Sequence, residues 1–215
     1  MLDFDQMQRE LYTGVICDTL DELGFRQQAM ESFVRPVHPD MRLVGRARTV
    51  LSVDLYHVRD DAYDKEIAFV DALLPGEVAV GCTNRSTRTG LWGELLSTAA
   101  KVRGARGAVM DGYVRDVRRI VEMGFPVFAG GMRPVDSRGR GIVIDYDVPV
   151  ECAGVVVRSG DIVFADFDGV AIIPQEVAEE TVAKALDKVR RENDTRAELE
   201  QGGFLRDVYA KYGVL

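Results

Sequence analysis

The sequence is poor in cysteine and histidine. Its cysteines, Cys17, Cys82 and Cys152, are odd in number and far apart, so they predict neither a disulfide framework nor a zinc knuckle. Because His38 and His57 are the only histidines, a multi-histidine metal site or a serine-histidine relay has little material. Any metal site is therefore expected to be hard and oxygen-ligated.

Positive charge and long apolar runs are scarce as well. Asp and Glu number 35 against 27 Lys and Arg, for a formal net charge of -8, which repels polyanions and does not support binding to nucleic acid or anionic membranes. No apolar run of about 18 residues is present. The opening MLDFDQMQRE is acidic and polar, where a signal peptide would be basic and then apolar. We expect a cytoplasmic protein.

The chain of 215 residues is 47% hydrophobic, which is enough for one large core. It contains no linker, repeat or low-complexity segment that would divide it. The sequence therefore predicts a single domain over residues 1–215.

Hydrophobic periodicity predicts an α/β arrangement in the middle of the chain. A Val-rich alternating strand is expected within 35–54, followed by a helix around 61–73. Leu91, Leu95, Ala99 and Val102 then fall on one face of a helix that stops at Gly104. The next segments, GAVMDG, VRDVRRIVEMG and PVFAG, favour a strand, a helix and a strand. Such alternation with short connections is typical of parallel crossover units.

The C-terminal part has a different character. Short Val and Ile runs about ten residues apart predict a β-rich return from Gly131 to Pro174. A long charged helix is expected over 176–193. A terminal stripe of Leu205, Val208, Tyr209 and Tyr212 predicts a last helix that packs on the core or on another subunit.

Two loops that lead from a strand into a helix are candidate ligand sites, because ligands of α/β sheets bind beyond the carboxyl ends of the strands. The first contains Gly93 and Glu94. Gly93 lets the backbone approach a ligand closely, and the free amides of Glu94, Leu95 and Leu96 would face an anion at the positive end of the helix dipole. This loop predicts a site for a small carboxylate.

The second loop lies within AVMDGYVRDVRRI, residues 108–120. Arg115 offers a planar fork for a carboxylate or keto oxygen, and Asp116 offers an anionic oxygen for a hard divalent cation such as Mg²⁺. Glu94 and Asp111 are candidates to hold water molecules around such a cation. The alternative is structural, because acidic residues commonly stabilise helix ends and Asp111 is equally suited to a turn or a cap.

Several neighbouring residues have both a functional and a structural interpretation. Loop arginines would bind a distal substrate carboxylate or simply be solvated, and we favour the second. Trp92 would line a pocket or pack in the core. GDIVFADFDG resembles an Asp-rich metal loop, yet its Asp-Gly step favours a hairpin turn. The arginines in question are Arg85, Arg88, Arg133, Arg138 and Arg140.

The pattern around these loops resembles the RraA-like family, which includes class II 4-hydroxy-4-methyl-2-oxoglutarate/4-carboxy-4-hydroxy-2-oxoadipate aldolases and regulators of RNase E activity. The mark of the family is an acidic residue, twenty intervening residues and then Arg-Asp, which Glu94 and Arg115-Asp116 reproduce here. The resemblance extends over residues 13–189. It includes the segments VICDTLDELG, LVGRARTV, GFPVFAGG and SGDIVFADFDGVAIIP.

The resemblance implies a fold, an assembly and roles for site residues. The fold would be a layered α/β/α domain with a central mixed β-sheet. Asp116 would be the direct Mg²⁺ or Mn²⁺ ligand, Arg115 would hold the pyruvyl part of the substrate, and the amides from Gly93 to Leu96 would bind its carboxylate. Glu94 stands where the characterised aldolases carry the shorter Asp. The chain would form a homotrimer or homohexamer, with the C-terminal helices from about 176 at an interface and a neighbouring subunit's acidic residue completing the site.

The implied activity is cleavage of short 2-keto dicarboxylic acids to pyruvate. 4-Hydroxy-4-methyl-2-oxoglutarate cleavage and oxaloacetate decarboxylation share a pyruvate enolate, which a divalent cation and Arg115 would stabilise. Aldol cleavage also needs a base, for which a water molecule held by Glu94 or Asp111 is the candidate. The alternative is a non-catalytic regulator that binds a ribonuclease E-like partner. A methyltransferase is not favoured, because no Gly-rich nucleotide loop follows a strand.

Overall fold

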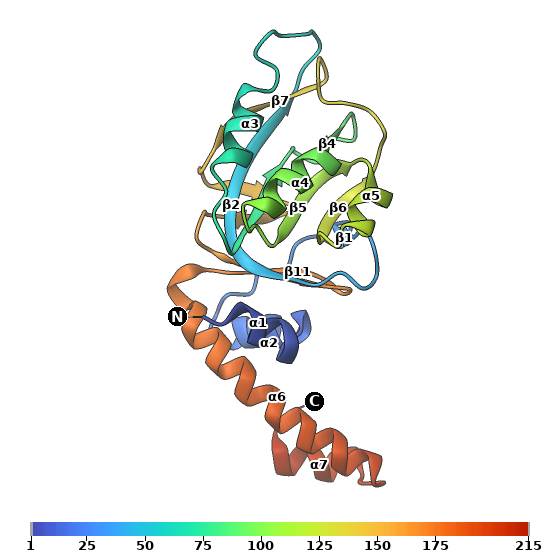
Figure 1. Ribbon diagram of the computed structural model, residues 1–215. Helices are drawn as coiled ribbons and strands as arrows, with labels where there is room; N and C mark the ends of the chain where they lie inside the picture. Colours follow the sequence, from blue (N-terminus) through green and yellow to red (C-terminus); the bar gives the residue numbers. More distant parts are fainter. Residues whose placement is uncertain (1, 215) are drawn as a thin grey trace.

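The computed structural model describes residues 2–214, and these form a mixed α/β fold (Figure 1). In chain order the elements are α1 (Phe4–Glu10), α2 (Thr13–Glu22), β1 (Arg35–Pro36), β2 (Leu43–Asp54), α3 (Asp64–Asp71), β3 (Glu77–Cys82), β4 (Gly90–Trp92), α4 (Glu94–Val102), β5 (Gly107–Val114), α5 (Val117–Glu122), β6 (Val127–Met132), β7 (Gly141–Tyr146), β8 (Val150–Cys152), β9 (Val155–Val157), β10 (Ile162–Asp166), β11 (Gly169–Ile173), a 3-10 turn (Gln175–Val177), α6 (Ala178–Glu200) and α7 (Leu205–Tyr212).

The main sheet has the order β1-β6-β5-β3-β2-β10-β11, with β4 beside β5 and β7 beside β2. Strands β2, β3, β5 and β6 are parallel neighbours, and α3, α4 and α5 lie in the connections between them. The predicted crossover units are therefore confirmed. Antiparallel pairing of β1, β7, β10 and β11 makes the sheet mixed, as expected.

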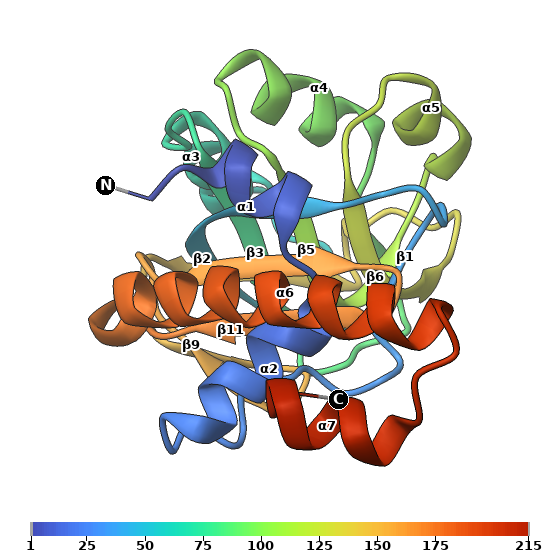
Figure 2. The same cartoon turned by 90° about the horizontal axis from the view of Figure 1, so that it is seen from below.

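Different elements cover the two faces of the sheet. Helices α3, α4 and α5 lie together on one side (Figure 2), and the β8–β9 hairpin packs against β2 and β3. The sheet is nearly closed, because Arg35 in β1 donates hydrogen bonds to the carbonyls of Phe167 and Asp168, in the β10–β11 turn, at 3.3 and 2.5 Å.

Besides the core between the sheet and helices α3, α4 and α5, a second hydrophobic core joins α1, α2 and α6 to β2, β10 and β11. Large apolar side chains fill it, including Leu11, Ile16, Leu20, Phe164 and Ile173. Asp166 at the end of β10 accepts hydrogen bonds from the amide and hydroxyl of Thr13, at 2.8 and 2.6 Å, where α2 begins. Since Asp166 and Gly169 are paired across the tight β10–β11 turn, the hairpin interpretation of GDIVFADFDG is confirmed.

The residues predicted to share one apolar face of this helix do not form the buried face of α4. Leu91 lies in β4, and Leu95 and Val102 are 75% and 81% exposed. The helix instead packs through Ser97 and Ala100, because small side chains let it approach the buried Trp92, whose indole nitrogen donates to Ser97 Oγ at 2.8 Å. Helical periodicity identified an apolar face here but not the neighbour that covers it.

The C-terminal helices extend along and beyond the sheet, with α7 folded back beside α6 (Figure 1). Helix α6 continues to Glu200, past the predicted end. In the terminal stripe Val208 is fully buried, whereas Leu205 and Tyr209 are about half exposed.

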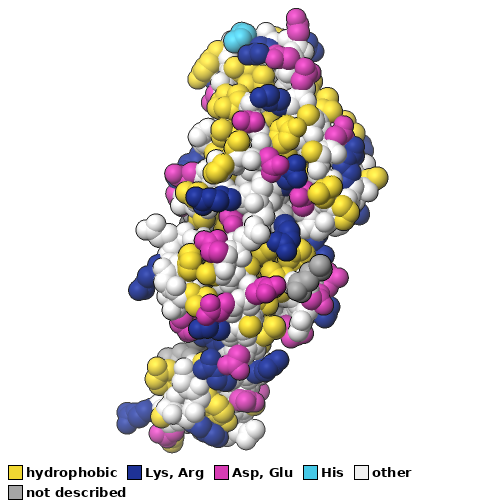
Figure 3. Space-filling view, turned by 90° about the vertical axis from the view of Figure 1, so that its left-hand side faces the viewer, with side chains coloured by type: hydrophobic (Ala, Val, Ile, Leu, Met, Phe, Trp, Pro, Cys, Tyr) yellow, Lys and Arg dark blue, Asp and Glu magenta, His cyan; other side chains and the backbone are white. Residues whose placement is uncertain are grey.

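Within residues 2–214, no helix is long and apolar enough to cross a membrane. The face in Figure 3 interleaves acidic and basic side chains without a continuous basic patch.

Candidate functional site

A pocket of about 270 Å³ lies at the carboxyl ends of the parallel strands, the position where α/β sheets commonly bind ligands. Its walls come from the start of α3, the β4–α4 connection, the β5–α5 connection and the loop after β6. The sequence predicted five of its residues, Gly93, Leu95, Leu96, Arg115 and Asp116, and the structure adds Tyr63, Glu66, Ile67, Leu91 and Asp136.

Parallel pairing of β4 with β5 brings the two predicted loops together. The Arg115 amide donates to the Trp92 carbonyl at 2.8 Å, which places Gly93 directly beside Arg115 and Asp116. A Cβ atom at position 93 would lie 2.8 Å from Asp116 Oδ2. Glycine therefore leaves room for the side chains of Arg115 and Asp116 against the backbone, and the two halves of the motif meet in space.

Asp116 has a left-handed backbone with φ of 58° at the start of α5. Its Oδ2 atom accepts a hydrogen bond from the Glu94 amide at 3.3 Å, and its side chain is 44% exposed. No group of three His, Cys, Asp or Glu side chains within residues 2–214 is arranged to hold a metal ion. A hard cation bound at Asp116 would therefore have to take one protein carboxylate and fill its shell with water and substrate oxygens.

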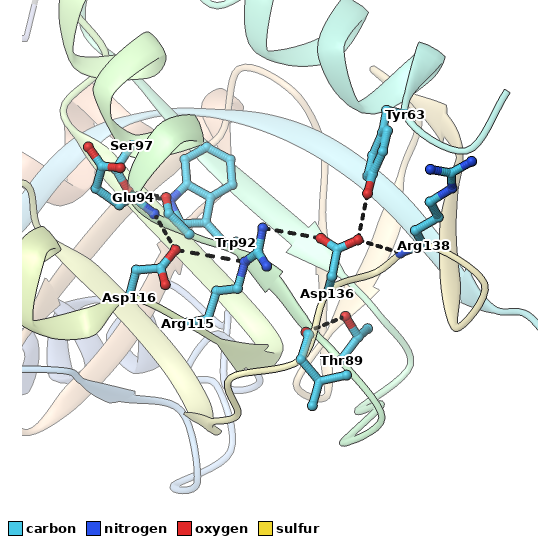
Figure 4. A network of polar contacts seen from close by, with 11 residues as sticks. Tyr63, Thr89, Trp92, Glu94, Ser97, Arg115, Asp116, Asp136 and Arg138 are labelled. Atoms are coloured by element: carbon cyan, nitrogen blue, oxygen red, sulfur yellow. Dashed lines mark hydrogen bonds and ion pairs between the residues drawn. The ribbon is translucent and has the colours of Figure 1, made fainter. Parts of the chain in front are cut away.

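Arg115 is held between two carboxylates (Figure 4). Its Nη2 atom lies 3.1 Å from Asp136 Oδ1, and its Nε atom lies 3.8 Å from Asp116 Oδ2. The other oxygen of Asp136 accepts hydrogen bonds from the Tyr63 hydroxyl at 2.5 Å and the Arg138 amide at 3.0 Å. These contacts fix the direction in which the guanidinium faces the pocket.

The same contacts keep Asp136 ionised. Partial burial acts to raise the pKa of Asp136, but hydrogen bonds from Tyr63 and Arg138 and the charge of Arg115 outweigh it and hold that pKa below its ordinary value. The sequence does not predict Asp136, because in RPVDSRGRG the arginines are the candidate ligand-binding residues. It does not predict Tyr63 either, although residues 63, 66 and 67 have helical spacing and all three line the pocket.

Glu66 is a buried acid in the wall of the pocket. Glu66 is only 8% exposed, and its Oε2 atom has no hydrogen-bond partner. Burial raises the pKa of Glu66 to about 7, and the negative charge of Asp136 adds to this effect, while Arg115 and Ser137 act in the opposite direction. Glu66 can therefore gain or lose a proton near neutral pH.

This pKa shift predicts a pH dependence of stability. Below the ordinary pKa of 4.5, Glu66 is protonated in both the folded and unfolded states, so it contributes no pH dependence there. Between 4.5 and about 7 the unfolded state loses the proton first, so the free energy of unfolding falls as pH rises. We expect Glu66→Gln to gain about 2–3 kcal/mol relative to wild type between pH 5 and pH 8. Urea unfolding of both proteins would test this, and a pH-independent difference would contradict it.

Glu94 and Asp111 are not among the residues that line the pocket, although Glu94 lies between Gly93 and Leu95, which do, and its predicted role stays a prediction. The Glu94 carboxylate accepts a hydrogen bond from Thr98 Oγ1 at 3.1 Å. Asp111 is buried, and its oxygens accept from the Thr83 amide and hydroxyl, at 2.6 and 2.8 Å, and from the Arg85 amide at 3.3 Å. The contacts of Asp111 match the turn-stabilising alternative, and its catalytic role stays a prediction.

The remaining candidates also lie outside the pocket lining. Arg85 pairs with Glu31, and the guanidinium of Arg88 lies 4.0 Å from the Tyr56 ring centroid. Arg133 and Arg140 donate to carbonyls of Thr87 and Asp136. Trp92 is buried and its ring stacks on Phe125 with centroids 6.5 Å apart, as the core-packing alternative expects.

These features define an α/β protein with a small polar pocket, in which an arginine, three carboxyl groups and a helix N-terminus meet. The family described as RraA-like (Aldolase/RraA) matches residues 13–172. Since the match covers most of the sequence, the chain belongs to the RraA-like family.

Individual relatives agree with this assignment. A protein of Halalkalibacterium halodurans named "Putative 4-hydroxy-4-methyl-2-oxoglutarate aldolase" is 32% identical over 87% of this chain and 84% of its own length. The crystal structure of Streptomyces coelicolor RraAS2, an unusual member of the RNase ES inhibitor RraA family, has a TM-score of 0.82 and 31% identity over 91% of this chain and 96% of that one. An uncharacterized Pseudomonas syringae protein has a TM-score of 0.87 and 25% identity over 97% and 93% of the two chains.

Proposed function

We propose that this protein is a divalent-metal-dependent lyase that cleaves short 2-keto dicarboxylic acids to pyruvate. The observation that carries the proposal is the charge balance of the pocket, where Glu66, Asp116 and Asp136 surround the single basic side chain of Arg115. An anionic keto acid would be repelled by these carboxylates unless a cation were bound with it. The relatives named as aldolases support the same activity.

The chain's own groups would bind and orient the substrate. Arg115, aimed by Asp136, would contact the keto oxygen and a carboxylate oxygen through its planar fork. The amides at the start of α4, which has Gly93 as its N-cap, would bind the carboxylate at the positive end of the helix dipole. The contact from Arg115 would stabilise the negative charge that develops on the keto oxygen as the carbon-carbon bond breaks.

Asp116 would hold Mg²⁺ or Mn²⁺ through the carboxylate beside the Glu94 amide. When bound, the cation would withdraw electron density from the 2-keto acid. Asp116 is suited to this because its carboxylate is partly exposed and forms part of the pocket wall beside Arg115.

The predicted homotrimer or homohexamer belongs to the same proposal. Leu95 and Ile67 line the pocket, and together with Val102 they are apolar residues more than half exposed. A neighbouring subunit that covered them would also shield the pocket from water, which strengthens electrostatic interactions inside it.

Pyruvate release tests the proposed activity. Oxaloacetate and 4-hydroxy-4-methyl-2-oxoglutarate are each incubated with the protein in the presence of Mg²⁺, Mn²⁺ or EDTA, and pyruvate is detected with lactate dehydrogenase. We expect turnover with either cation and its loss with EDTA, because the acidic pocket needs a counter-charge. The ratio of the two rates would distinguish decarboxylase from aldolase. An absence of cation-dependent turnover on both substrates would contradict the proposal.

A non-catalytic regulator is the second candidate. It is favoured by the similarity to RraAS2, whose description places it in a family of RNase ES inhibitors. Such a role would require binding to a ribonuclease E-like protein and no pocket chemistry. Normal binding by a variant without Arg115, combined with no turnover by wild type, would favour the regulator.

A further inference from the structure

The buried Glu66 carboxyl is only partly satisfied within the protein, where the side chain of Ser137 hydrogen-bonds to it. Its Oε2 atom is buried without a hydrogen bond, and such an atom is costly unless something outside the fold uses it. The other two pocket acids are engaged, because Asp136 contacts Tyr63, Arg115 and Arg138 and Asp116 accepts from the Glu94 amide. Glu66 is therefore the pocket-lining acid that has a carboxyl oxygen without a hydrogen bond among the described residues.

Glu66 lies on a different wall of the pocket from the groups proposed to bind the keto acid. It belongs to α3, whereas Arg115 and the α4 amides come from the connections around β4 and β5. Asp136, hydrogen-bonded to Tyr63 and paired with Arg115, links these walls (Figure 4). Glu66 and Arg115 therefore line the same pocket from different walls.

We propose that Glu66 is a catalytic residue that transfers a proton between the substrate hydroxyl and C3 of the pyruvate enolate. This inference rests on the proposed lyase function. It replaces the water held by Glu94 or Asp111 as the base, since neither carboxylate lines the pocket.

Glu66 alone can accept and return the one proton that moves during aldol cleavage. Ionised Glu66 takes the C4 hydroxyl proton, the O–H electron pair forms the new carbonyl, and the C3–C4 pair moves into the enolate. Protonated Glu66 then returns the same proton to C3, which gives pyruvate and the keto product. In oxaloacetate decarboxylation the C3–C4 bond breaks with loss of CO₂, and Glu66 delivers to C3 a proton that it regains from water.

The charges around Glu66 suit both halves of this cycle. Asp136 disfavours its ionised form, whereas Arg115 and the buried Ser137 favour that form. These groups come from the β5–α5 connection and the loop after β6, and Tyr63 lies on the same wall as Glu66. Opposing influences of this kind leave the proton easy to move in either direction near neutral pH.

Exchange of the pyruvate methyl protons with D₂O tests the proposal, because it reports enolate formation without a cleavage substrate. Wild type, Glu66→Gln and the control Glu122→Gln are compared by proton NMR with Mg²⁺ present. Glu122 is an exposed glutamate of α5 paired with Arg118. We expect Glu66→Gln to lose exchange and pyruvate release by about 100-fold or more, and the control to match wild type.

Oxalate binding, measured by calorimetry with Mg²⁺, separates proton transfer from substrate binding, since oxalate resembles the planar enolate. We expect the dissociation constants of wild type and Glu66→Gln to agree within about threefold, as proton transfer adds no binding. Equal exchange by the two proteins overturns the role of Glu66 while leaving the lyase intact, and joint loss of exchange and oxalate binding overturns proton transfer in favour of binding. If wild type neither exchanges nor cleaves, the lyase function itself fails and the role of Glu66 fails with it.

Discussion

Asp116→Asn is expected to lower cation-dependent pyruvate release by about 1000-fold or more, because it removes the proposed cation-binding charge and with it several kcal/mol of transition-state stabilisation. Asparagine is the informative replacement. Asp116 has φ of 58°, a left-handed conformation that Asn tolerates well, and the amide oxygen of Asn can still accept from the Glu94 amide. The backbone should therefore be preserved while the charge is lost.

Asp147→Asn provides the matched control. Asp147 also has a left-handed backbone, with φ of 61°, and its carboxylate is similarly exposed and paired with Arg48 at 3.0 Å. It lies outside the pocket lining, so its replacement should leave turnover unchanged. Mn²⁺ binding, followed by electron paramagnetic resonance, gives a reading independent of activity and should weaken only in Asp116→Asn. Full turnover and cation affinity in Asp116→Asn would overturn the assignment.

The part of the site that the sequence predicts is the part built by local chain geometry. Gly93, Arg115 and Asp116 lie in strand-to-helix connections, and parallel strands present their carboxyl ends at one edge of a sheet. Once the middle of the chain is interpreted as crossover units, these loops must be neighbours. The crossover units follow from the same periodicity, whereas the central mixed sheet is implied by the family resemblance.

The rest of the site depends on contacts between distant segments. Asp136 is in a loop after β6 and meets Tyr63, at the start of α3, through a hydrogen bond across 73 positions. Glu66 sits in DKEIAFVD, where a charged residue among other charged residues is typical of a solvated helix face. The groups that act on its carboxyl, Asp136 and Ser137, lie about 70 positions away in the sequence, which no local pattern encodes. The exposure of Leu95 on α4 has the same origin, because it depends on which segments cover the helix.

Arg115→Lys is expected to reduce kcat/KM for pyruvate release by about 100–1000-fold, although the positive charge is kept. Lysine lacks the planar fork that lies 3.1 Å from Asp136 and 3.8 Å from Asp116 and cannot make two parallel hydrogen bonds to a carboxylate. Steady-state kinetics with Mg²⁺ on whichever keto acid is cleaved would measure this loss. Arg118→Lys is the control, since Arg118 on α5 is almost fully exposed and pairs only with Glu122.

The split of the Arg115→Lys effect between kcat and KM tests how the arginine acts. If Arg115 only retains the substrate, KM rises and kcat is unchanged, whereas stabilisation of charge that develops on the keto oxygen lowers kcat as well. Because Asp136 fixes the guanidinium in place, Asp136→Asn should show a weaker version of the same kcat loss. Once lysine has replaced Arg115, Asp136→Asn should add little, since Asp136 then has no guanidinium to aim. Fully additive losses in the double variant would show that the two side chains act separately.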